Sequence, residues 1–182
     1  MDRVQSTIQK VNTYPHRKAI ARTCRARKHG NKAKRRKTPL GAGQKSYGIS
    51  EYGGFSAEVA VGQYLSLYRQ LFEKFTKPLL PDRYDYLYHD RPLEVKSTLR
   101  RDAPLCIYDE KKAQYYVLVW PTGTVHRWDI VGYLTHKQMQ DRGRWREGVR
   151  NGRKWKRFEV AAGDLEDIKE LLPEDRIMRF GT

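Results

Sequence analysis

The sequence predicts an α/β protein in which helices flank a mixed central β-sheet. Three patterns indicate this class. Residues 55–75 carry apolar side chains at the three- and four-residue spacing of one helix face. Residues 84–98 alternate in the period-2 manner of two half-buried strands. Residues 115–120 form a nearly continuous apolar run, which is typical of a central strand buried on both faces.

The N-terminal segment, residues 1–52, is strongly basic. The first 50 of the 182 residues hold 14 Lys or Arg and one acid, Asp2, a net charge of +13. Residues 51–182 hold 23 Lys or Arg and 20 acids, a net charge of +3. A segment with so little apolar surface is expected to be a poorly structured arm. Its charge favours a polyanion as partner, by contacts to phosphates that release counterions.

The basic residues of this arm are candidate nucleic-acid contacts. They are Arg25, Arg27, Lys28, Lys32, Lys34, Arg35, Arg36 and Lys37. The alternative is a solvated or nuclear-targeting tail. The composition does not separate DNA from RNA as the bound polymer.

Several other classes of protein are disfavoured. Cys24 and Cys106 lie far apart with no CxxC companion, which supports neither a disulfide framework nor a zinc site. The five histidines lack metal-ligand spacing, and no glycine loop suited to cradling phosphates is present. No apolar run approaches the length of a membrane span, and the first residues are polar, so we expect a cytoplasmic protein without a membrane partner.

The helix predicted over residues 55–75 follows Gly53 and Gly54. Ser56 is a plausible N-cap, and Pro78 and Pro81 are expected to fix its end. The next segment predicts a hairpin with its turn between Asp90 and Arg91.

With that turn, Asp85 faces Lys96, and Leu87 faces Glu94. A turn of even length places Asp85, Glu94 and Lys96 on one face, with Tyr84, Tyr86 and Tyr88 packed in the core on the other.

The three charged side chains on one face point to a metal site. Two neighbouring carboxylates repel each other unless a cation lies between them. Oxygen ligands of this kind suit Mg²⁺, completed by water and substrate phosphate. The nearby lysine can hold or activate an attacking water. The alternative is a surface ion network, Asp85 with Lys96, without catalytic use.

Asp85, eight intervening residues, and then Glu94-Val95-Lys96 followed by Ser97-Thr98 resemble the motif of the PD-(D/E)XK nuclease superfamily, over about residues 54–120. The resemblance implies a restriction-endonuclease-like domain over residues 53–182 and a Mg²⁺- or Mn²⁺-dependent endonuclease acting on DNA. Asp85, Glu94 and the backbone carbonyl of Val95 would hold the ion, and Lys96 would position water. Products would carry 5′-phosphate and 3′-hydroxyl ends.

Three details of the resemblance stay open. Glu58 is either an additional metal or water ligand, since many superfamily members carry a glutamate on the first helix, or a first-turn acid favoured by the helix dipole. Pro81-Asp82 also matches the first half of the motif, but Asp82 has the wrong parity on a straight strand. Residues 99–114 are too few for the longer helix usual in the superfamily, and leave room for a short helix or an extended crossover.

The remaining elements complete the sheet and its cover. Residues 125–134 predict a strand, with Thr135 capping a short helix that runs through Asp141. Residues 142–157 interleave basic side chains with Trp145 and Trp155, which fits either a nucleic-acid surface or an ordinary solvated edge strand. Asp164 is expected to cap a final amphipathic helix.

Two other functions remain as alternatives. Residues 54–58, Gly-Phe-Ser-Ala-Glu, resemble the start of archaeal Holliday-junction resolvases, which would imply a two-fold dimer. The other alternative is a non-catalytic DNA- or RNA-binding protein that uses the basic arm and carries the carboxylates incidentally.

Overall fold

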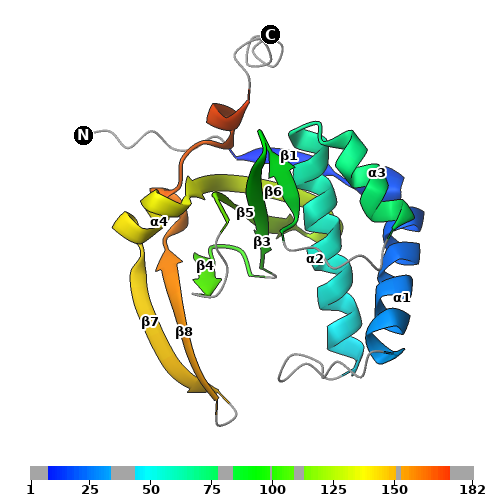
Figure 1. Ribbon diagram of the computed structural model, residues 1–182, viewed down its shortest axis with the longest axis horizontal. Helices are drawn as coiled ribbons and strands as arrows, with labels where there is room; N and C mark the ends of the chain where they lie inside the picture. Colours follow the sequence, from blue (N-terminus) through cyan, green and yellow to red (C-terminus); the bar gives the residue numbers. More distant parts are fainter. Residues whose placement is uncertain are drawn as a thin grey trace.

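The computed structural model describes residues 8–33, 44–77, 84–98, 100–108, 113–150 and 153–172. Within them, the chain forms four α-helices, a curled mixed five-strand sheet and a three-strand antiparallel sheet (Figure 1). The helices are α1 (Arg17–Ala33), α2 (Gln44–Tyr64), α3 (Tyr68–Thr76) and α4 (His136–Arg142). The predicted α/β class is confirmed.

The strands divide between two sheets. They are β1 (Gln9–Asn12), β2 (Tyr86–Tyr88), β3 (Arg91–Ser97), β4 (Leu105–Tyr108), β5 (Tyr115–Thr122), β6 (Thr124–Thr135), β7 (Arg144–Arg150) and β8 (Arg153–Val160). The larger sheet has the order β1-β6-β5-β3-β2, with β3 and β5 parallel, and the smaller has the order β4-β8-β7. The described part of the connection from β3 to β5 contains β4 and no helix, which agrees with the extended crossover, one of the two alternatives expected there.

Strand β5 carries the core on both of its faces. Val117 and Val119 pack in the cluster that α2 covers, whereas Tyr116, Leu118 and Trp120 pack in the cluster beneath β4, β8 and α4. All five side chains are buried. The prediction of a central strand buried on both faces is confirmed, and the five-strand sheet lies between α2 and the smaller sheet.

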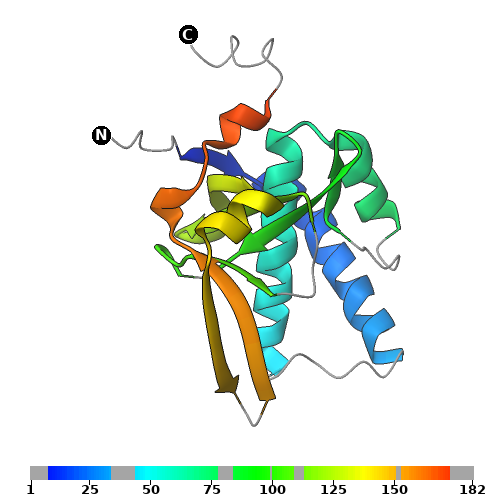
Figure 2. The same cartoon turned by 60° about the vertical axis from the view of Figure 1, so that its left-hand side comes forward.

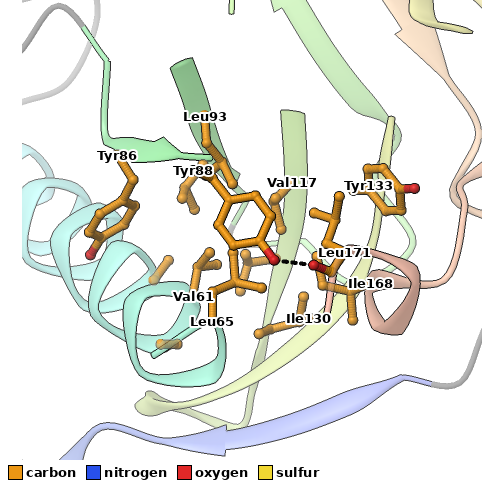
Figure 3. Close-up of a cluster of buried hydrophobic side chains, with 14 of the residues drawn as sticks. Val61, Leu65, Tyr86, Tyr88, Leu93, Val117, Ile130, Tyr133, Ile168 and Leu171 are labelled. Carbon is orange, nitrogen blue, oxygen red and sulfur yellow. Dashed lines mark hydrogen bonds between the residues drawn. The ribbon is translucent and has the colours of Figure 1, made fainter. Parts of the chain in front are cut away.

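The tyrosines of the hairpin belong to the α2 side of the core. Tyr86 and Tyr88 are buried with Val61 of α2 and with Leu65, which follows that helix, as predicted (Figure 3). Tyr84, predicted in the core as well, is only partly buried and lines a cavity. The Tyr88 hydroxyl donates to the Leu171 carbonyl, which ties β2 to the C-terminal part of the described chain. The hairpin is therefore fixed by its apolar face, and its other face is free to carry charge.

The helix expected over residues 55–75 is two helices. α2 begins at Gln44, ahead of the two glycines, and the chain breaks after Tyr64, where Ser66 has φ 57°. Ser56 therefore caps nothing. Its Oγ lies inside the core, 3.0 Å from the Trp128 Nε1 that donates to it and 2.8 Å from the Thr13 hydroxyl. α3 ends at Thr76, and Pro78 and Pro81 lie outside the described residues.

In the described residues 8–33 and 44–52, the N-terminal segment differs from the poorly structured arm that its composition predicts. β1 pairs with β6, and α1 packs against α2 through Ile20, Cys24 and Phe55. Ile20 and Cys24 are four residues apart on one helix face, so this segment has a narrow apolar stripe despite its charge. The expected division between residues 52 and 53 falls inside α2.

The C-terminal elements are partly as expected. Thr135 caps α4 through a capping box with Gln138, which confirms that prediction. The prediction of a final amphipathic helix capped by Asp164 is wrong. Two short 3₁₀ segments lie there instead, Ala162–Asp164 and Ile168–Leu171, and Asp167 caps the second. Among the described helices, none is both long and apolar enough to cross a membrane.

Candidate functional site

The β2–β3 hairpin sets the positions of the candidate acids. Its turn residues are His89 and Asp90, with φ 48° and 57°, the left-handed values of a two-residue type I′ hairpin. Tyr86 pairs with Leu93, so the turn is one residue earlier than predicted. The turn length is still even, so the parity holds. Continuing the register by one residue places Asp85 opposite Glu94, where Lys96 was expected, and on the face that Glu94 and Lys96 share.

Asp85 is held against β3 by its own backbone and side chain. Its backbone N–H donates to the Leu93 carbonyl at 3.1 Å, and its Oδ2 accepts the Val95 N–H at 2.7 Å. Because one carboxylate oxygen is fixed in this way, the orientation of the other is determined as well. Asp82, the competing candidate, lies outside the described residues.

Glu94 and Lys96 form an ion pair on β3. Lys96 Nζ donates to Glu94 Oε1 at 2.7 Å. The Glu94 side chain is 5% exposed, whereas that of Lys96 is 22% exposed. The carboxylate is thus buried beside a lysine that still reaches solvent.

Glu58 joins this group from α2. Its Oε2 accepts from Lys74 Nζ at 3.0 Å, and its Oε1 lies 4.0 Å from a guanidinium nitrogen of Arg27. The backbone carbonyl of Glu58 also accepts the Tyr86 hydroxyl at 2.8 Å, which fixes α2 to the hairpin. Glu58 lies several turns after Gln44, where α2 begins, so it is not a first-turn acid. The helix-dipole explanation of Glu58 is therefore wrong.

Two residues of α3 complete the group, and the sequence alone did not single them out. Lys74 is buried, pairs with Glu58 and lies 5.1 Å from the centre of the Tyr86 ring. Gln70 clamps β2, since its amide donates to the Leu87 carbonyl at 2.7 Å and accepts the Leu87 N–H at 2.8 Å. A signal for Lys74 was present, because it follows Leu71 by three residues on the apolar stripe of the helix.

A cavity gives access to part of this group. It has a volume of about 800 Å³ and lies between α3 and the hairpin. Asp85 and Lys74 contribute to its lining, together with Gln70 and Tyr84. Asp85 can therefore meet a ligand from this side.

The electrostatics of the site centre on Asp85. The pKa of the Asp85 carboxyl is raised from 3.8 to about 8. Burial is the largest cause, and the negative charges of Glu58 and Glu94 add to it. Lys74 and the hydrogen bond from the Val95 N–H lower the pKa in part. Glu58 and Glu94 are therefore each close enough to Asp85 to disfavour its charged form. A cation bound beside Asp85 would have the opposite effect and favour the charged carboxylate.

This shift predicts a pH-dependent stability in metal-free protein. Between about pH 4 and pH 8, folded Asp85 keeps a proton that the unfolded chain has lost, so its contribution to stability decreases as the pH rises. We expect Asp85→Asn, measured in chelator, to raise the melting temperature relative to wild type by an increment that grows from about pH 5 to about pH 8. The exposed Asp141→Asn serves as the control. An increment that is the same at every pH would contradict the assignment.

The predicted nucleic-acid contacts have different positions. Arg25 is exposed and lines a cavity of about 680 Å³ along α1, with Arg17, Lys18 and Arg22. Arg27 turns inward, with its guanidinium carbon 4.5 Å from the centre of the Phe55 ring. Lys28 and Lys32 lie in α1, but the structure does not describe their side chains. Four more predicted contacts lie outside the described residues: Lys34, Arg35, Arg36 and Lys37. α1 thus presents a basic surface, and Arg27 belongs instead to the carboxylate group.

Comparisons with family models, with curated proteins and with solved structures gave no match. The site must therefore be interpreted from its own geometry. Within the described residues, no three His, Cys, Asp or Glu side chains gather closely enough to form a metal site by themselves. The candidate centre is thus two carboxylates and a lysine on the hairpin, with Glu58 and Lys74 beside them.

Proposed function

We propose that this protein is a divalent-metal-dependent endonuclease that hydrolyses DNA phosphodiester bonds, with a restriction-endonuclease-like core of the PD-(D/E)XK type. The observation that carries the proposal is the placement of Asp85 opposite Glu94 on one face of the hairpin, with Glu58 near enough that both neighbouring charges raise the pKa of Asp85. Clustered like charges cost stability. Where they persist, they are more typical of functional sites than of structural ones.

The donor set fits a hard divalent cation. Its side-chain donors are carboxylate oxygens, which Mg²⁺ and Mn²⁺ prefer, and Mg²⁺ is commonly held by one or two carboxylates together with water and substrate phosphate. Asp85, Glu94 and the Val95 carbonyl would hold the ion. Glu58, already paired with Lys74, acts on the site through its charge. When bound, the ion polarises the phosphoryl oxygen and supports the departing oxygen.

The residues of the chain supply the rest of the chemistry. Asp85 is fixed by the Val95 N–H, so its free oxygen needs no rearrangement to receive a ligand. Lys96 is partly exposed next to Glu94, and from there its ammonium group positions the attacking water and stabilises negative charge on the phosphate. Lys74 restrains Glu58 and limits the repulsion at Asp85.

A second candidate function is supported by the pairing of these same groups. Glu58 has Lys74, Glu94 has Lys96, and Asp85 has the Val95 N–H. A network satisfied in this way is also suited to a purely structural role. The protein would then be a non-catalytic nucleic-acid-binding protein that acts through the basic surface of α1.

An activity panel separates the two functions. Supercoiled plasmid, linear duplex, a four-way junction and duplex RNA are incubated with the full chain in Mg²⁺, Mn²⁺ or chelator. We expect nicks or breaks in DNA with either ion and none in chelator. Preference for the four-way junction would identify the resolvase subtype. Binding of all DNA substrates without cleavage in any condition would overturn the nuclease and favour the non-catalytic protein.

A further inference from the structure

The β7–β8 ribbon projects from the body of the protein. Its strands pair from Arg144 with Glu159 to Arg150 with Arg153, and Figures 1 and 2 show the ribbon extending away from the five-strand sheet. In the described structure, β4 pairs with β8 only over residues 157–160, so the outer part of the ribbon has two strands alone. Two-stranded ribbons are marginally stable in water, so a long one that projects calls for a functional explanation.

One face of the ribbon is arginine-rich. Residues that are directly paired share a face, which places Arg144, Arg146 and Arg157 together with Glu159. Arg144 is exposed, and the Arg146 side chain is 61% exposed. Arg157 Nε donates to Glu159 at 2.7 Å, and Arg146 Nε lies 3.7 Å from the same carboxylate. A single acid thus holds two opposed guanidinium groups, and the face keeps a net positive charge.

Aromatic side chains stiffen the ribbon. Trp155 contacts Gly148, where a Cβ would lie 2.7 Å from the ring, and the Arg157 guanidinium carbon lies 4.6 Å from the centre of the Trp155 ring. On the other face, Trp145 stacks on Phe158 with their ring centres 4.1 Å apart. The arginines are therefore presented on a rigid support, which lowers the entropy lost on binding a partner.

We infer that the β7–β8 ribbon enters the major groove of duplex DNA, with its arginine face against phosphates and base edges. The major groove of B-form DNA is about 12 Å wide and admits a two-stranded β-ribbon. The major groove of A-form RNA is too deep and narrow for this, so the geometry favours DNA over RNA. The inference rests on the proposed function only in taking DNA as the polymer, and it names duplex DNA as the form recognised.

The test measures binding in chelator, so a failure of catalysis does not affect it. The double variant Arg144→Gln with Arg146→Gln is compared with wild type by fluorescence anisotropy on duplex DNA and on duplex RNA of the same sequence. The control, Lys10→Gln with Lys137→Gln, removes two exposed charges from β1 and α4. We expect the ribbon variant to bind duplex DNA about tenfold or more weakly, with a salt slope smaller by about 2, since each lost phosphate contact removes about 0.9.

The groove is tested by the reactivity of guanine N7, an atom in the major groove, towards dimethyl sulfate. Wild type should protect N7 positions that the ribbon variant leaves reactive. Unchanged DNA affinity in the ribbon variant would overturn the inference. Equal losses on DNA and RNA, or wild-type binding without N7 protection, would overturn it as well, because the surface would then be a general polyanion contact.

Discussion

Glu94→Gln should reduce DNA cleavage by about 100- to 1,000-fold in Mg²⁺, comparable to the loss of one preorganised charge-stabilising group in other enzymes. The substitution keeps the volume of a side chain that is only 5% exposed, but it removes the charge that faces Asp85 and pairs with Lys96. Lys96→Met should have a similar effect through the loss of its ammonium group. Single-turnover nicking rates on supercoiled plasmid give the comparison directly.

Matched controls are available on α4. Asp141→Asn and Lys137→Met remove a carboxylate and an ammonium group from exposed positions and should leave the nicking rate unchanged. DNA affinity in chelator should be retained in all four variants, which separates chemistry from binding. Wild-type cleavage by both Glu94→Gln and Lys96→Met would remove these residues from the mechanism.

Lys74→Met should destabilise metal-free protein by about 3 kcal/mol, a fall in melting temperature of roughly 6–12 °C for a chain of this size. Lys74 is buried and neutralises Glu58 at 3.0 Å. Its removal leaves that carboxylate with the longer, 4.0 Å contact to Arg27 and next to Asp85, whose pKa Lys74 normally lowers. Thermal and denaturant unfolding in chelator measure the loss.

A double-mutant cycle with Glu58→Gln shows whether the loss arises from this pair. We expect a coupling energy of about 1–3 kcal/mol, since both partners are largely buried and in contact. The exposed pair Arg69 and Glu73 is the control, with Arg69→Met and Glu73→Gln expected to couple by less than about 0.5 kcal/mol. Additive losses for Lys74 and Glu58 would show that Lys74 stabilises the fold by packing alone.

The sequence was sufficient where a local pattern decides the outcome. The alternation around Asp85 and Glu94 predicted the shared face, because a one-residue error in the turn centre leaves the parity of an even turn unchanged. The run at residues 115–120 predicted burial on both faces, and Thr135 predicted the capped start of α4. Each of these features depends on neighbours in sequence or on side-chain periodicity alone.

The sequence was insufficient where contacts between residues far apart in the chain determine the structure. Ser56 is a good N-cap type, yet its hydroxyl receives the Trp128 indole, 72 residues away, inside a longer helix. The basic composition of residues 1–52 hid the apolar stripe through which α1 packs on α2. The pairing of Lys74 with Glu58 requires the break at Ser66, which turns α3 back toward the hairpin and which neither residue encodes by itself.

The most direct test of the account is calorimetric titration of Mn²⁺ into metal-free wild type, Glu94→Gln and the control Asp141→Asn. A centre formed by Asp85 and Glu94 predicts saturable binding in wild type and Asp141→Asn, with affinity at least tenfold weaker in Glu94→Gln. No saturable binding to wild type, or equal affinity in all three proteins, would contradict it.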